Sequence, residues 1–162
     1  MTAPPPASDV EIMEIDAEHP DATWCLERYF AELASRFDDG FDAALSTAPT
    51  VDEFRPPRGL FLIARRGNEP IGCAGLKLPS GKPAEIKRMW VAPSARGLGL
   101  GRRLLAELER AAVREGARAI RLETNKALTE AIGLYRSAGY REVEAFNDEH
   151  YAHHWFAKRL RA

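Results

Sequence analysis

The sequence has 162 residues, of which 45% are hydrophobic and 29% charged, and its formal net charge is −1. This length suits one hydrophobic core rather than two domains. The balanced charge gives no argument for binding nucleic acid. No apolar stretch approaches the ~20 residues of a membrane-spanning helix, and the N-terminus lacks the basic and apolar regions of a signal peptide. Cys25 and Cys73 form neither a disulfide framework nor a metal-ligand spacing.

These bounds predict a cytoplasmic protein without a bound metal. The Pro- and Ala-rich segment 1–9 is typical of a disordered tail, and 10–162 is expected to form a single domain.

The first third of the chain predicts one strand and two helices. A strand is expected at 10–15, and a helix follows with Asp21 as its N-cap. Its apolar residues recur at helical spacing as far as Phe37. A shorter helix is expected at 41–46. The polar, proline-containing stretch 47–58 predicts a loop, which we expect to help close a substrate site.

The rest of the chain alternates strands and helices. Hairpin connections predict an antiparallel meander of strands at 60–66, 71–78 and 85–91. A helix at 101–115 then leads to a strand at 119–123, and this crossover places that strand parallel to 85–91. Thr129 is the expected cap of a helix to Ser137. Two strands, 140–144 and 151–160, complete the chain.

The pattern therefore predicts an α/β (α+β) fold. Its mixed, mostly antiparallel sheet has about seven strands, a parallel pair at the middle and about four flanking helices. The long final strand would expose edge groups through which two copies could pair as a homodimer.

The most informative stretch is 84–105, AEIKRMWVAPSARGLGLGRRLL. A strand leads through an Arg- and Gly-rich turn directly into a helix. Small residues let backbone N–H groups approach a phosphate, and the helix dipole favours negative charge there. The G-x-G-x-G spacing is not that of a dinucleotide-binding fold, and no G-K-[ST] follows, which excludes a P-loop. The turn therefore predicts an anion-binding cradle of another kind.

Three further features give the stretch a family resemblance. Arg96, Gly99 and Gly101 match the motif Q/R-x-x-G-x-G/A, and both KRMWV before it and LYRSAGY after it are similar to family members. Over roughly residues 60–160 the chain resembles the GNAT superfamily of acetyl-CoA-dependent N-acetyltransferases. The resemblance implies acetyl-CoA as the acetyl donor, held where the central parallel pair splays apart.

It also implies which residues bind the donor. Backbone groups of Met89, Trp90 and Val91 would meet the pantetheine arm and the thioester carbonyl, although Trp90 reads equally well as a core aromatic. The diphosphate would lie on Arg96, Gly97, Leu98, Gly99, Leu100, Gly101 and Arg102. Asn125 would contact the pantetheine or the acceptor, or would simply form a turn before a helix.

Acetyl transfer to an amine requires a base, because an alkylammonium with a pKa near 10 cannot attack, and an acid for the leaving thiolate. By the resemblance, Glu85 is the candidate base; the alternative is a solvated Glu paired with Lys87. Tyr135 in LYRSAGY is the candidate acid. His153 and His154 point to opposite faces of a strand, so one of them would face the acceptor. Lys77, Lys87 and Arg88 offer cations for an acceptor carboxylate.

The expected function is transfer of acetyl from acetyl-CoA to a primary amine of a small molecule. No Cys or Ser stands in a nucleophile setting, which favours direct attack in a ternary complex. Two alternatives stay open at this point. The first is a peptide or protein N-acetyltransferase, and the second is a CoA-binding sensor without catalysis.

Overall fold

The computed structural model describes residues 9–45 and 51–161, so most of the expected tail and part of the 47–58 loop lie outside the described residues. One seven-stranded sheet has the order β1-β2-β3-β4-β5-β7-β6. Only β4 and β5 are parallel. The strands are β1 (Val10–Ile15), β2 (Gly59–Arg66), β3 (Glu69–Lys77), β4 (Ala84–Val91), β5 (Ala119–Thr124), β6 (Arg141–Val143) and β7 (His154–Arg159). The predicted mixed sheet with a central parallel pair is confirmed.

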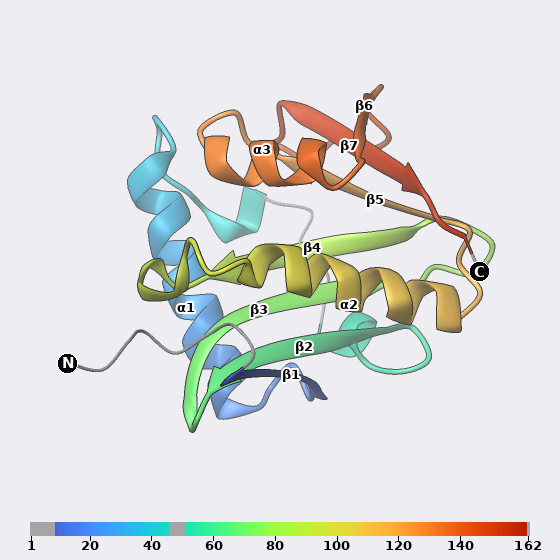
Figure 1. The fold of residues 1–162 in the computed structure, drawn as a ribbon. Coiled ribbons are helices and arrows are strands. Elements are labelled where there is room, and N and C mark those ends of the chain that lie inside the picture. Colours follow the sequence, from blue (N-terminus) through green and yellow to red (C-terminus); the bar gives the residue numbers. More distant parts are fainter. Residues whose placement is uncertain (1–8, 46–50, 162) are drawn as a thin grey trace.

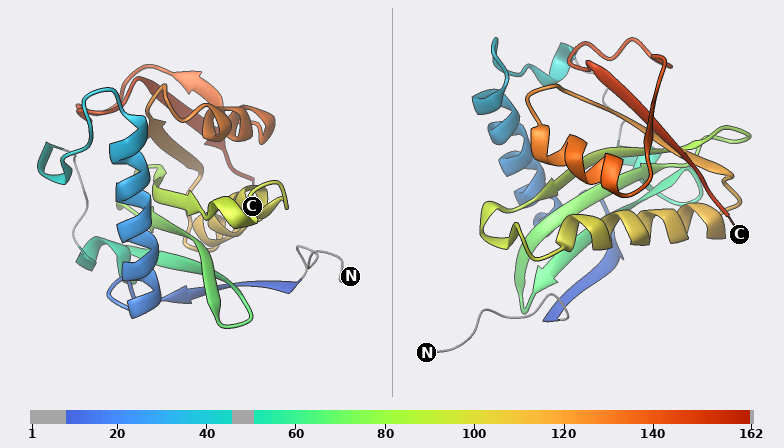
Figure 2. Two further views of the ribbon diagram at one scale, coloured as in Figure 1. Left: turned by 90° about the vertical axis from the view of Figure 1, so that its left-hand side faces the viewer. Right: turned by 45° about the horizontal axis from the view of Figure 1, so that its top comes forward.

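In the described residues three helices cover the sheet, in one layer on each face (Figures 1 and 2). Helix α1 (Pro20–Arg36) lies on one face, whereas α2 (Leu100–Arg114) and α3 (Thr129–Ser137) lie on the other. Each packs through an apolar stripe; α2, for example, buries Leu104, Leu105 and Leu108 completely or almost so. Three short 3₁₀ turns add to these helices at 43–45, 51–54 and 93–95. The described helices are too short or too polar to cross a membrane.

The parallel pair separates soon after it forms. Backbone register joins β4 to β5 only at Ala84↔Ile120 and Glu85↔Arg121. Farther along, β4 contains a bulge opposite Ala74 of β3, and Arg88 there has a left-handed φ of 56°. A non-glycine residue in this region stores strain, and a bulge bends its strand. The two strands therefore diverge at the middle of the sheet and leave room between them.

Several predicted boundaries differ from the structure. His19, not Asp21, caps α1: its Nδ1 accepts a hydrogen bond from the Asp21 N–H at 3.0 Å, because Pro20 takes the first helical position. Thr129 is the first residue of α3 rather than its cap. The short helix expected at 41–46 is a 3₁₀ turn at 43–45.

The final strand is shorter than predicted and does not lie at an edge. It lies between β5 and β6, so its hydrogen-bonding groups are used within the sheet. The edge strands are β1 and β6. The prediction that two copies pair through an exposed final strand is therefore wrong, because this strand does not lie at an edge.

Candidate functional site

The Gly-rich turn between β4 and α2 forms one end of a cleft. Gly97 and Gly99 have left-handed φ values of 84° and 77°, and a Cβ at either would meet no atom within 4 Å. The first backbone N–H groups of α2 have no acceptor within the helix, so they are free to donate. Glycine is required at both positions by backbone conformation, and the open space beside them admits a bulky anion.

Gly101 has a different role. Its neighbour across the cleft is α3: a Cβ at Gly101 would lie 2.8 Å from Leu134 Cδ2. The absence of a side chain therefore lets α2 approach α3 closely. The motif combines two glycines that shape the turn with one that permits helix packing.

The cations predicted beside the turn are already engaged. Arg96 donates to Val91 O at 3.1 Å and to Glu32 Oε1 of α1 at 2.6 Å. Partial burial pushes the pKa of Glu32 upward, but the hydrogen bonds from Arg96 and Trp90 outweigh it and hold that pKa below the ordinary value. Arg102 donates to Ser137 Oγ at 2.8 Å, so the predicted cations surround the turn as part of a network.

The cleft runs from this turn along β4. Its volume is about 380 Å³, and its walls come from α1, β4, the Gly-rich turn and α3. Met89, Trp90 and Val91 all line it. The Trp90 side chain is buried and its indole N–H donates to Glu32 at 3.2 Å, so this residue is a core aromatic whose strand also borders the cleft. Of the predicted donor-binding residues, Leu98 and Asn125 do not line this cleft.

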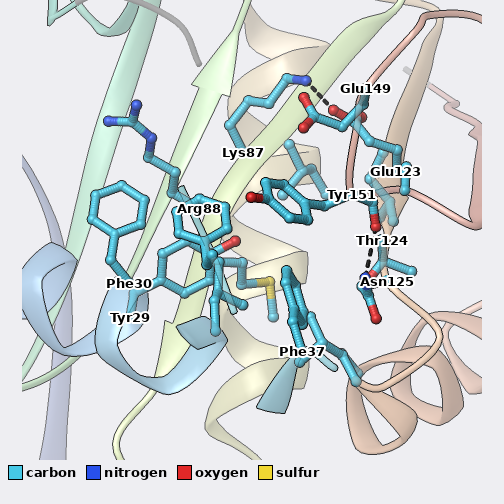
Figure 3. Close-up of a pocket in the computed structure, with 18 of the residues that line it drawn as sticks. Tyr29, Phe30, Phe37, Lys87, Arg88, Glu123, Thr124, Asn125, Glu149 and Tyr151 are labelled. Carbon is cyan, nitrogen blue, oxygen red and sulfur yellow. Dashed lines mark hydrogen bonds and ion pairs between the residues drawn. The ribbon is translucent and has the colours of Figure 1, made fainter. Parts of the chain in front are cut away.

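A second, smaller pocket continues from the first. Its volume is about 130 Å³, and it shares Tyr29, Met89 and Tyr135 with the cleft. Figure 3 shows side chains from α1, β4, β5 and the segment before β7 converging on it. One wall is aromatic and the opposite wall carries charges. The aromatic side chains are Tyr29, Phe30, Phe37, Phe41 and Tyr151.

Acidic and basic side chains of β4 and β5 pair with one another. Glu85 lies 2.9 Å from Arg121 through one oxygen and 3.8 Å from Lys87 through the other. Lys87 also forms a hydrogen-bonded ion pair with Glu123 Oε1. Glu85 does not line the pocket, whereas Glu123 does. Among these carboxylates, Glu123 alone has an oxygen, Oε2, that is buried without a hydrogen-bond partner.

That oxygen is unusual because the Glu123 side chain is only 7% exposed. A buried carboxylate oxygen without a donor carries a desolvation cost of about 1–3 kcal/mol or more. Glu123 lines the pocket, but this oxygen itself is closed to solvent. Sequence analysis did not single out Glu123. One feature of the sequence could have indicated Glu123: it is a charged residue at the end of a central strand, two positions after Arg121.

Tyr135 lies where the cleft and the pocket meet, as a shared lining residue. Burial, and next the Glu123 carboxylate, raise the pKa of Tyr135 to about 12. Burial and the neighbouring Tyr135 likewise raise the pKa of Tyr29. Both hydroxyls are therefore protonated near neutral pH and can donate, and the role of Tyr135 as general acid stays a prediction.

The remaining predicted residues have other contacts. Asn125 lines the pocket, but its Nδ2 donates to Tyr151 O at 2.7 Å and its Oδ1 accepts from Ala127 N at 2.8 Å. It thereby holds Tyr151 against the aromatic wall. His153 accepts from Lys126 N, and His154 Nδ1 lies 2.8 Å from Glu142. Neither histidine lines the pocket, nor does Lys77, so the structure does not bring these three to the site.

Comparison with known proteins indicates one protein family. The family model described as "Acetyltransferase (GNAT) family" matches residues 14–140. An IAA acetyltransferase of Azospirillum brasilense is 41% identical over 122 residues, which cover 75% of each chain.

Two solved structures share the fold. A GNAT-family acetyltransferase from Staphylococcus aureus aligns with a TM-score of 0.77 at 18% identity, covering 94% of this chain and 99% of that one. An aminoglycoside 6′-N-acetyltransferase complexed with coenzyme A aligns with a TM-score of 0.68 at 20% identity, covering 94% and 98%. The segment matched by the family model, 14–140, includes the Gly-rich turn and Tyr135.

Proposed function

We propose that this protein, which belongs to the acetyltransferase (GNAT) family, transfers an acetyl group from acetyl-CoA to a primary amine of a small molecule. One observation carries the proposal: an open cleft that begins at a helix N-terminus adjoins, at Tyr135, a small pocket whose lining includes the Glu123 carboxylate. The two ends suit an anionic donor and a cationic acceptor respectively.

The residues beside the Gly-rich turn fit the donor's diphosphate. Gly97 and Gly99 leave open space, the first turn of α2 offers backbone N–H groups, and Arg96 and Arg102 border the same cleft. The pantetheine arm would run along Met89, Trp90 and Val91 toward Tyr135. When bound, acetyl-CoA supplies the thioester carbonyl that the amine attacks.

The reaction needs two proton transfers on the acceptor side. The ammonium first loses a proton, and the amine nitrogen then forms a bond to the thioester carbon. The C–S bond breaks and the sulfur gains a proton from Tyr135, while the second proton lost by the nitrogen returns Tyr135 to its protonated form. The products are an acetamide, free CoA and one proton released to solvent.

Two carboxylates compete for the role of proton acceptor. Glu85 is the sequence-based choice, but Arg121 and Lys87 occupy its two oxygens and it lies outside the pocket wall. Glu123 lines the pocket, and its carboxylate lies close enough to Tyr135 to raise that hydroxyl's pKa. We therefore favour Glu123, acting directly or through a water, with Glu85 fixing the position of Lys87.

The pocket size favours a small acceptor. An engineered cavity of about 150 Å³ holds a single benzene molecule, and this pocket measures about 130 Å³. A small metabolite amine would occupy the pocket and the adjoining part of the cleft, whereas a protein acceptor would insert only its terminal group.

The test is thiol release from acetyl-CoA with a panel of amines that includes short peptides, measured while both substrates are varied. Intersecting initial-rate lines with a small amine are the expected result for a ternary complex. Parallel lines would indicate a covalent acetyl-enzyme. Binding of acetyl-CoA without turnover on any amine would overturn the proposal and favour a sensor.

A further inference from the structure

The aromatic wall of the small pocket is continuous. Phe30 and Phe41 stack with ring centroids 5.5 Å apart and planes within 10°. Phe41 also contacts Tyr151 at 4.9 Å, and Phe37 contacts both of them at 5.4–6.0 Å. Such a surface offers ring faces and edges to another aromatic ring.

Contacts within the protein hold this wall in place. The Tyr151 hydroxyl accepts a hydrogen bond from Asp42 N at 2.7 Å, and Asn125 anchors the Tyr151 carbonyl. The wall is thus attached both to the segment after α1 and to the end of β5. A braced aromatic surface does not have to be ordered when a ligand binds, which lowers the entropic cost of binding.

The cations at the pocket are directed elsewhere. Lys87 is paired with Glu123 and Glu85. The Arg88 guanidinium lies over the rings of Phe30 and Phe54, at 5.4 and 5.6 Å from their centroids. Figure 3 shows the Arg88 side chain extending away from Glu123 and Tyr151. A carboxylate placed near the Glu123 oxygen would therefore meet negative charge, and like charges brought together at a binding site are costly.

From the aromatic wall and the Glu123 carboxylate in the lining of the same pocket, we propose that the acceptor is a small primary arylalkylamine without a carboxylate. Its ammonium group lies beside the Glu123 carboxylate, and its ring packs against Phe37, Phe41 and Tyr151. This inference rests on the proposed acetyl transfer and names the acceptor class for the same site.

The experiment compares amines that differ in one feature each. Thiol release is measured with 2-phenylethylamine, with phenylalanine (the same amine plus a carboxylate), with 2-cyclohexylethylamine (the same shape without a π system) and with spermidine. The expected order of kcat/KM places 2-phenylethylamine first. Phenylalanine falls at least 100-fold lower, and 2-cyclohexylethylamine lies between them.

Two variants test the wall itself. Phe41→Leu should lower kcat/KM for 2-phenylethylamine about three- to tenfold, mostly through KM, which is the size expected of one aromatic pair. The same change should alter kcat/KM for 2-cyclohexylethylamine less than twofold. Phe146→Leu is the matched control, since Phe146 packs against Arg121 outside the pocket. If Phe41→Leu does not fold, Phe37→Leu provides the same readout.

The outcomes separate the two proposals. Turnover that is best with phenylalanine or spermidine would overturn the arylalkylamine inference and leave acetyl transfer intact. Equal effects of Phe41→Leu on the two ring-bearing amines would also overturn it. Absence of thiol release with every amine would instead contradict the proposed function.

Discussion

The proposed donor cleft and the proposed acceptor pocket are built by different means. The cleft depends on backbone conformation within one short stretch: a bulged strand, two left-handed glycines and a helix N-terminus. The pocket depends on side chains from α1, β4, β5 and the segment 149–152. A site made from backbone is sensitive to few substitutions, whereas a site made from side chains can change its ligand without changing the fold. The difference explains how one scaffold can keep its donor and vary its acceptor.

The largest expected effect contrasts the two central carboxylates. Glu123→Gln removes the proposed base and should lower kcat/KM for the amine by about 100-fold or more, the scale of a general base. Both Glu123→Gln and Glu85→Gln break buried ion pairs and should lower the free energy of unfolding by about 3 kcal/mol, but Glu85→Gln should leave kcat/KM nearly unchanged. Amine kinetics and urea unfolding of both variants provide the measurement. The reverse pattern would return the catalytic role to Glu85.

The next largest effect is expected from substitution of Gly99, in the cleft proposed to bind acetyl-CoA. Gly99→Val forces a β-branched side chain into a left-handed conformation and fills the open space beside the turn. The KM for acetyl-CoA should rise at least about tenfold, with little change in the amine's KM. Gly67→Val, in the β2–β3 turn at a φ of 63° with equal space, is the matched control and should cost stability only. Equal donor KM values in the two variants would exclude the diphosphate from this turn.

A smaller effect is expected at Gly101. Gly101→Ala should lower the free energy of unfolding by about 1 kcal/mol through crowding of Leu134, without a change in donor KM. In the background of Leu134→Val the same substitution should be neutral, because the crowded methyl group is gone. A rise in donor KM with unchanged stability would show that Gly101 serves the donor rather than the packing of α2 on α3.

The smallest effect lies away from both sites. Two hydrogen bonds from Arg55, at 2.7 and 3.1 Å, hold the pKa of Asp16 at about 2 instead of 3.8. Since the folded pKa is the lower one, this pair stabilises the protein above pH 3.8 and loses its effect as the pH falls toward 2. Asp16→Asn should therefore flatten that part of the acid unfolding curve, while the exposed Asp39→Asn should not. Neither change should alter kinetics near neutral pH.

The contrast between the halves also explains what could be predicted from sequence. The antiparallel meander, the parallel pair and the Gly-rich turn follow from local patterns, and the structure confirms them. The aromatic wall could not be predicted, because Phe37, Phe41 and Tyr151 come together only through folding. Glu123 was missed because its importance arises from what it lacks, a partner for Oε2, and a sequence does not display missing contacts. The final strand was misplaced because edge status depends on the position of β6, a strand of only three residues.

The central claim is that the cleft and the pocket meet at Tyr135, where acetyl transfer occurs. Its most direct test is the kcat of Tyr135→Phe with the best amine. Tyr140→Phe is the control, because Tyr140 is a buried tyrosine outside both sites whose hydroxyl is hydrogen-bonded to Glu109 at 2.9 Å. Loss of a general acid should lower kcat by about 100-fold or more in Tyr135→Phe, with both KM values nearly unchanged. Tyr140→Phe should retain kcat. An unchanged kcat in Tyr135→Phe would contradict the account.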